Sequence, residues 1–210
     1  DTDGTDNDRQ NGFESLGLSP ELCAALQRLG FSQPAPIQKA ALPAILQGRD
    51  GIVQSQSGTG KTSMLAIASV AICERAGARD QEEGAKTKQT PTPGGGGLDG
   101  DADGDRRDGY HTRSELRLRT IILSPSRELA FQTCGVVNRI GFRLGIRCNQ
   151  VAGGKMVKQD RQTFGKAHVC SGTPGRMFQL LSSKGSDVRV GSVVRFLVID
   201  EVDEILGDGF

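Results

Sequence analysis

The segment SQSGTGKT, residues 55–62, constrains the fold of this chain more than any other part of its sequence. It follows the apolar pair Ile52 and Val53, which we interpret as part of a buried strand over residues 51–55, and it precedes a long helical pattern that begins at Lys61. Glycines between a strand and a helix let several backbone N–H groups converge on one concavity. Such a concavity suits a phosphate group, so the sequence predicts a phosphate-binding loop.

The rest of the chain alternates apolar runs typical of strands with helical patterns. Continuous runs of Ile, Leu and Val separated by helices favour an α/β fold with a mostly parallel sheet that helices cover on both faces. The polar segments after the strands should then share the carboxyl edge of the sheet, where such folds bind ligands. We expect strands over residues 119–124, 145–153, 167–172 and 193–200, and helices over residues 20–30, 37–48, 61–76, 126–140, 155–164 and 173–183, with Pro43 interrupting the second helix.

Two segments lack these patterns. Residues 1–12 are acidic and polar, and residues 77–112 are rich in Gly, Pro and Asp. We therefore expect one domain over residues 13–210, preceded by a disordered tail and interrupted by a disordered insertion. Inside the insertion, DGDADG resembles the opening of a calcium-binding loop. Tyr110 stands where that loop needs Glu, so a calcium site is not favoured.

Charge and cysteine content limit the class of protein. The tail and the insertion each carry a net charge of −3, which leaves +7 on the rest of a chain whose total is +1. A basic core fits a polyanionic partner, although an ordinary solvated surface would look the same. The five cysteines show no C-x-x-C spacing, which predicts free thiols in a reducing compartment, cytoplasmic or nuclear. No apolar run is long enough to cross a membrane, and we expect no membrane partner.

The residue types around the loop predict phosphate chemistry. Gly58 and Gly60 let the backbone approach phosphate oxygens, Lys61 can reach the β- and γ-phosphates, and the Thr62 hydroxyl can coordinate Mg²⁺. The apolar run RFLVID ends in Asp200, a carboxylate that can hold Mg²⁺ through its water shell. Glu201 follows and can orient or deprotonate a water molecule for attack on the γ-phosphate. Together these segments predict hydrolysis of a nucleoside triphosphate.

The order of motifs resembles the first RecA-like domain of a DEAD-box RNA helicase, from Phe13 to Phe210 outside the insertion. GFSQPAPIQ at residues 30–38 resembles the Q motif, SQSGTGKT motif I, PSRELA at 125–130 motif Ia, Gly153-Gly154 the GG motif, TPGR at 173–176 motif Ib, and DEVD at 200–203 motif II. VQSQSGTGKT and DEVDEILGDGF further resemble the subgroup of translation initiation factor four-A and its exon-junction relative. Val202 stands where the family has Ala.

The resemblance implies a binding site for ATP and Mg²⁺. The side-chain amide of Gln38 would select adenine, with Phe31 and Gln33 beside the base; taken by itself, Gln38 could equally be an exposed helical residue. Lys61, Asp200 and Glu201 would be the catalytic residues, and Thr62 and Asp200 would hold the metal ion. The expected nucleotide contacts are Phe31, Gln33, Gln38, Ser57, Gly58, Thr59, Gly60, Lys61, Thr62 and Ser63.

The resemblance also implies contacts to the phosphate–sugar backbone of single-stranded RNA, which carry no sequence information. The chain has no Trp, one Tyr and eight Phe, a composition that favours backbone recognition over base stacking. The implied RNA contacts are Pro125, Arg127, Gly153, Gly154, Thr173, Pro174, Gly175 and Arg176.

The function implied is that of an ATP-dependent RNA helicase that binds single strands and unwinds duplexes, with translation-initiation or exon-junction proteins as partners. An ATP-gated RNA clamp or assembly scaffold is the alternative, and the Q motif and TPGR argue against an unrelated P-loop ATPase. The sequence stops just past motif II, before the SAT motif and second RecA-like domain of the family. We therefore expect a fragment or a truncated reading frame, nearly inactive alone because no arginine finger is present.

Overall fold

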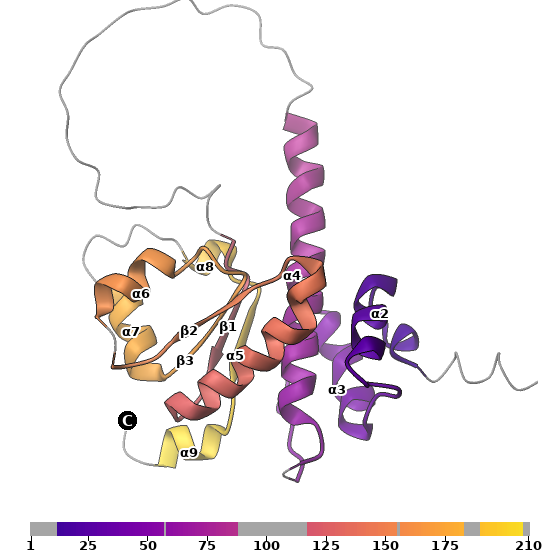
Figure 1. Ribbon diagram of the computed structural model, residues 1–210, viewed down its shortest axis with the longest axis horizontal. Coiled ribbons are helices and arrows are strands. Elements are labelled where there is room, and N and C mark those ends of the chain that lie inside the picture. Colours follow the sequence, from indigo (N-terminus) through magenta and orange to yellow (C-terminus); the bar gives the residue numbers. More distant parts are fainter. Residues whose placement is uncertain (1–11, 57, 88–116, 155, 183–189, 208–210) are drawn as a thin grey trace, which may run out of the picture.

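A single parallel sheet organises the computed structural model, which describes residues 12–56, 58–87, 117–154, 156–182 and 190–207 (Figure 1). The spatial order of the strands is β2-β3-β1-β4, and all neighbours are parallel. Thr120 of β1 pairs with Val169 of β3 and with Phe196 of β4, so the strands start at one level. The predicted α/β fold is therefore confirmed; the strands are β1 (Thr120–Leu123), β2 (Cys148–Val151), β3 (Val169–Gly172) and β4 (Phe196–Ile199).

Helices cover both faces of this sheet. On one face lie α4 (Lys61–Thr87) and α5 (Arg127–Gly141), whose apolar residues pack against the strands in the larger core. On the other face lie α6 (Val157–Thr163) and α7 (Pro174–Ser182), which form a smaller core. The larger core includes Ile67, Val70, Ile122, Val137 and Val198, and the smaller core includes Ile121, Val151, Cys170, Met177 and Leu180.

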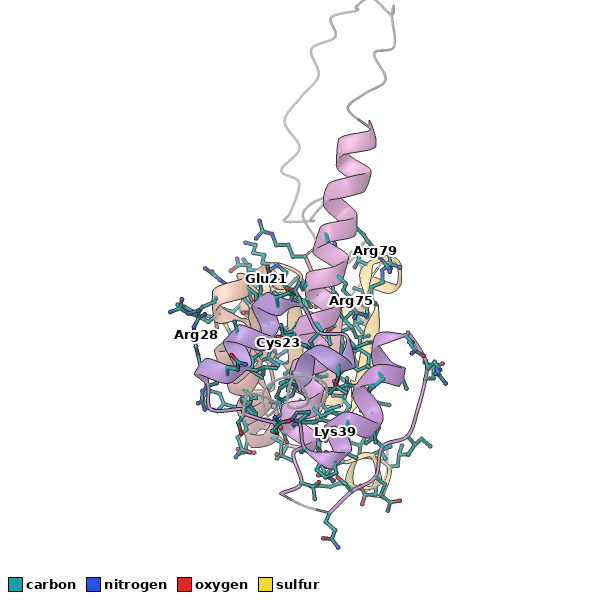
Figure 2. The ribbon with its side chains drawn as sticks, turned by 90° about the vertical axis from the view of Figure 1, so that its right-hand side faces the viewer. Glu21, Cys23, Arg28, Lys39, Arg75 and Arg79 are labelled. Atoms are coloured by element: carbon teal, nitrogen blue, oxygen red, sulfur yellow. The ribbon has the colours of Figure 1, made fainter. Side chains whose placement is uncertain are left out.

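The N-terminal segment packs on the outer side of α4 (Figure 2). It consists of the 3₁₀ helix η1 (Phe13–Leu16), α2 (Pro20–Arg28) and α3 (Pro36–Leu46). Ser19 caps α2 by accepting from the N–H of Leu22 at 3.2 Å. Arg75 of α4 donates to the carbonyl oxygens of Leu46 at 2.8 Å and Gly17 at 2.6 Å, which joins this segment to the helix behind the phosphate loop.

Short elements complete the described chain. The 3₁₀ helix η2 (Phe142–Leu144) follows α5, α8 (Val190–Val193) precedes β4, and α9 (Val202–Gly207) follows it. Within these ranges no helix is both long and apolar enough to cross a bilayer.

The strand predicted over residues 51–55 is wrong. These residues have no regular secondary structure, and Ile52 is 96% exposed while Val53 packs against the larger core. A strand needs a neighbour for its N–H and C=O groups, and no described strand pairs with this segment. Apolar character alone therefore predicted a strand in a segment that pairs with none of the described strands.

Two helix boundaries also differ from the prediction. Pro43 lies inside α3 and does not end it. Proline removes the bond to the carbonyl of Lys39, but Lys39 is exposed, so water can satisfy that carbonyl. Residues 77–87, predicted to be disordered, continue α4, because extending an existing helix through Ala, Glu, Gln, Arg and Lys is favourable. The tail at 1–11 and the rest of the insertion, 88–112, lie outside the described residues.

The cysteines are free thiols, as predicted, and all five are buried. Burial raises the pKa of the Cys73 thiol to about 11 and that of the Cys170 thiol to about 12. These thiols therefore stay protonated near neutral pH and behave as small apolar side chains.

Gly172 should be required where β3 meets β2. A Cβ atom at this position would stand inside the van der Waals radius of the Val151 carbonyl oxygen, which belongs to the neighbouring strand. We expect Gly172→Ala to lower the free energy of unfolding by about 1–3 kcal/mol, because the strands must move apart. Gly135→Ala is the control: nothing lies within 4 Å of its Cβ position in α5, so it should stabilise by about 0.5–1 kcal/mol. Denaturant titration compares the two, and equal effects would contradict the steric argument.

Candidate functional site

Polar side chains of the phosphate loop form hydrogen bonds within the loop. Gly58 and Gly60 have φ values of 78° and 99°, in the left-handed region that favours glycine. The Ser55 and Thr59 hydroxyl oxygens are 2.6 Å apart, and Thr59 also donates to the Gln56 carbonyl at 2.8 Å. Helix α4 begins at Lys61, so the N–H groups of its first turn, which have no partner within the helix, lie at this loop. Ser57, predicted to contact the nucleotide, lies outside the described residues.

The acid pair after β4 faces this loop. The Lys61 ammonium nitrogen lies 3.5 Å from a carboxylate oxygen of Glu201. Glu201 has a φ of 48°, unusual for a residue with a side chain, and its carbonyl accepts from the N–H groups of Glu204 and Ile205 at 3.0 and 3.1 Å. The chain thus turns sharply from β4 into α9. This turn brings the Glu201 carboxylate to the phosphate loop, as the predicted roles of both residues require.

Asp200 stands at the carboxyl end of β4. Its N–H donates to the Leu123 carbonyl at 2.8 Å, which continues the ladder with β1. Burial, and then the charge of Glu201, raise the pKa of the Asp200 carboxyl group. The ammonium group of Lys61 offsets part of this rise.

The donors around Asp200 fit Mg²⁺ bound together with a phosphate. Mg²⁺ is commonly held by one or two carboxylates, waters and substrate phosphates. Asp200 supplies a carboxylate, and Thr62, half-buried in the first turn of α4, supplies a hydroxyl. No group of three or more His, Cys, Asp or Glu side chains among the described residues could hold a metal by itself. The carboxylate and the hydroxyl are donor types that Mg²⁺ takes when substrate phosphates and waters complete its shell.

Gln38 connects the Q-motif segment to the phosphate loop. It is 2% exposed, so the alternative of an exposed helical residue is wrong. Its amide oxygen accepts from the Ala35 N–H at 2.9 Å, and its amide nitrogen donates to the Ser63 hydroxyl at 2.9 Å. Ser63 in turn donates to the Gly60 carbonyl at 2.9 Å. Sequence reasoning missed this link, because no local pattern pairs Gln38 with Ser63.

The residues predicted beside the base differ in exposure. Phe31 is half-buried and packs against the larger core. Gln33 is exposed on the segment before α3. Both lie near the start of the helix that carries Gln38, and their contact with a base stays a prediction.

The implied RNA residues Arg127, Gly153 and Gly154 meet at the carboxyl edge of the sheet. A Cβ atom on either glycine would lie 3.0 Å from the Arg127 guanidinium group, so the guanidinium lies against the GG backbone. The Gln150 amide donates to the Arg127 carbonyl at 3.1 Å and holds the start of α5 to β2. Arg127 and Gly154 are both exposed, so a charged donor and a backbone turn without side chains face solvent together.

The TPGR segment places its residues differently from one another. The Thr173 N–H donates to the Val151 carbonyl at 3.2 Å, and Thr173, Pro174 and Pro125 are half-buried. Gly175 is exposed. Arg176 is only 8% exposed, and its guanidinium donates to the buried carboxylate of Asp160 at 3.0 Å. This pair joins α7 to α6, and Asp160 was not foreseen because a carboxylate on a short helix carries no sequence signal.

Comparison with known families decides which proteins share this arrangement. The family model of the DEAD/DEAH box helicase matches residues 35–210, which include the phosphate loop, Arg127, TPGR and the acid pair. The chain belongs to the DEAD/DEAH box helicase family.

Similar proteins of the family are longer than this chain. ATP-dependent RNA helicase mak5 of Aspergillus oryzae is 30% identical over 95% of this chain and 23% of its own length. Eukaryotic initiation factor 4A-III homolog B of Oryza sativa subsp. japonica is 32% identical over 95% of this chain and 40% of its own length. The chain therefore spans less than half of these relatives, and their similar identities do not single out one subgroup.

Solved structures agree with the fold of this DEAD-box domain. Saccharomyces cerevisiae Dbp5 bound to RNA and ADP BeF3 is 25% identical with a TM-score of 0.64, covering 95% of this chain and 40% of that one. A DEAD box protein from Methanococcus jannaschii is 24% identical with a TM-score of 0.64. The match covers 93% of this chain and 43% of that chain, and it supports the fold.

Val202 is the residue of motif II that differs from the family. It is 42% exposed at the start of α9, so the larger side chain is accommodated at the surface.

The pair Arg176–Asp160 should act as a structural unit of the domain. Both side chains are buried, at 8% and 6% exposed, so removing one leaves the other charge buried without its partner. We expect Arg176→Ala to lower the free energy of unfolding by about 3–5 kcal/mol and the double variant Arg176→Met, Asp160→Leu to lower it by much less. Arg161→Ala, at an exposed position of α6, is the control. Denaturant titration measures all three, and a loss for Arg176→Ala no larger than for the control would contradict this role.

Proposed function

We propose that this chain is the nucleotide-binding domain of an ATP-dependent RNA helicase. The observation that carries the proposal is the 3.5 Å contact between Lys61 and Glu201, which joins the phosphate loop to the acids of motif II. The similarity to Dbp5 bound to RNA and ADP BeF3 supports the binding of both a nucleotide and RNA. Enzyme activity follows from the same residues: Lys61 would bind phosphate, and Glu201 would act on the attacking water.

The Lys61–Glu201 contact would belong to the nucleotide-free state, and binding of a triphosphate would break it. Both side chains are partly exposed, at 25% and 41%, so the ion pair is weak. A triphosphate carries more charge than one carboxylate and would draw Lys61 onto its β- and γ-oxygens. Glu201 would then be left to accept a hydrogen bond, and later a proton, from the attacking water. Asp200 and Thr62 would hold Mg²⁺, which neutralises phosphate charge when bound.

Selection of ATP is assigned to Gln38, with Phe31 and Gln33 beside the base. A Cβ atom on Gly60 would lie 3.2 Å from the Gln38 amide nitrogen, so this amide is next to the phosphate loop. A base held there would affect the loop through Ser63. Adenine recognition and phosphate binding would therefore be coupled.

RNA would bind at the carboxyl edge through its phosphates. Arg127 supplies the exposed guanidinium, and Gly153, Gly154 and Gly175 allow close approach of the backbone. Arg176 would support this surface from within by holding α7 to α6. Unwinding of duplexes, and partners from translation initiation or exon-junction assembly, would belong to a longer protein of the length of the relatives. Such a protein would act in the cytoplasm or nucleus.

Two substitutions at the ion pair separate binding from turnover. Lys61→Ala should weaken ATP binding, because it removes the charge that meets the phosphates. Glu201→Gln should retain ATP binding, because it is nearly isosteric and removes only the proton acceptor. A fluorescent ATP analogue measures binding by this chain, and phosphate release in the full-length protein measures turnover. Unchanged turnover in Glu201→Gln would exclude Glu201 as the base.

Gln38→Ala should relax the preference for ATP over GTP and also weaken both nucleotides, because it removes the amide and its bond to Ser63. Ser63→Ala is the matched control: it removes the same bond and leaves the amide, so affinity should fall while the preference for ATP is kept. Competition between ATP and GTP for the fluorescent analogue measures the preference. Equal binding of ATP and GTP before the Gln38 change would reject the adenine assignment.

A further inference from the structure

A basic residue immediately precedes each of the four strands. These residues, in spatial order Arg147, His168, Arg119 and Arg195, are called here the strand-start row. Backbone hydrogen bonds connect them in sequence across the sheet: His168 N–H to the Arg147 carbonyl at 2.9 Å, Arg119 N–H to the His168 carbonyl at 2.8 Å, and Arg195 N–H to the Arg119 carbonyl at 2.7 Å. The row is thus one rung of the sheet, at the edge opposite the motifs.

The register places these four residues at one level, directly before the first paired residue of each strand. Strand neighbours at the same level of a parallel sheet point the same way, and side chains alternate along each strand. His168 faces as Cys170 does, toward the side of the smaller core. With about 4.8 Å between strands, four basic residues span roughly 14 Å in a line. Arg147 and Arg195, at the two ends, are exposed, whereas Arg119 and His168 are half-buried.

The local field of the row is positive. Burial, and then Arg117, Arg119 and Arg147, lower the pKa of His168. The His168 Nδ1 atom accepts from the Arg147 N–H at 3.2 Å, which requires that this nitrogen carry no proton. Exposed Arg117 and Lys166 lie next to the row in the chain and add to this field.

We propose that the strand-start row is a second RNA-binding surface, which holds phosphates of a strand or duplex flanking the RNA at the carboxyl edge. The exposed guanidinium groups of Arg147 and Arg195 suit a polyanion, because each can donate two hydrogen bonds to one phosphate. The row contains no aromatic ring apart from the histidine, so it suits the backbone rather than the bases. The identity of the polyanion rests on the proposed function, whereas the charge row rests on the sheet register alone.

The first experiment compares short and long RNA strands on the 210-residue chain. The test variant is Arg147→Gln with Arg195→Gln, two exposed ends of the row. The control is Arg28→Gln with Lys39→Gln, which removes the same charge from exposed positions on α2 and α3 (Figure 2). Affinity is measured as a function of salt by fluorescence anisotropy, and thermal melting checks that both variants are folded.

We expect the long strand to bind the unmodified chain more tightly than the short strand. The row variant should lose this gain, and its salt slope should fall by about 1.4, since each lost contact on a single strand accounts for about 0.7. The short strand should bind the row variant and the unmodified chain alike, and the control should keep the gain. No binding of either strand would reject the proposed function. Binding of the short strand without a gain for the long one, or a gain that the row variant keeps, would overturn the row proposal alone.

A second readout follows His168 directly. The chain has two histidines, so the imidazole proton spectrum is simple, and His168→Gln assigns its signal. A phosphate at the row would favour the charged imidazole and raise the pKa of His168, whereas RNA bound only at the carboxyl edge would leave it unchanged. A pKa of His168 that does not move at saturating long RNA would overturn the proposal.

Discussion

The in-register parallel pairing of β1 with β3 and β4 is the constraint on which the rest of the structure depends. Because Thr120, Val169 and Phe196 stand at one level, every strand ends near the same edge. Asp200 continues the ladder beyond β4, and the Thr173 N–H bonds to the end of β2. The acids of motif II and the TPGR segment therefore lie at one edge of the sheet. The same register aligns the residues before the strands, the strand-start row, at the opposite edge.

Two contacts between distant segments turn this edge into a site. The Lys61–Glu201 contact joins the loop that would bind phosphate to the acid that would act on water. Gln38 joins α3 to the first turn of α4 through Ser63. Neither contact is strong by itself, since a partly exposed ion pair and a single neutral hydrogen bond each contribute about 1 kcal/mol. Their importance is that they position groups whose chemistry depends on geometry.

Sequence reasoning succeeded where the signal was local. The helices α5 and α7 and the strands β1, β3 and β4 follow from apolar periodicity, and the capping serines Ser19 and Ser126 lie where the helices were expected to begin. It failed where the outcome depended on neighbours. Residues 51–55 are apolar enough for a strand but pair with no described strand, and Pro43 is tolerated because the carbonyl that it leaves unpaired is on an exposed turn.

The sequence by itself determined the fold class, the phosphate loop, the acid pair and the family, because each depends on residue types at fixed spacing along the chain. Only the tertiary structure decided what Gln38 and Arg176 contact. The sequence predicted that both side chains face a ligand at the surface. Gln38 is instead 2% exposed, and Arg176 is 8% exposed and paired with Asp160. The alignment of four basic residues also needed the sheet. Burial and ion pairing depend on which segments meet in space, and a single sequence without its fold does not specify those meetings.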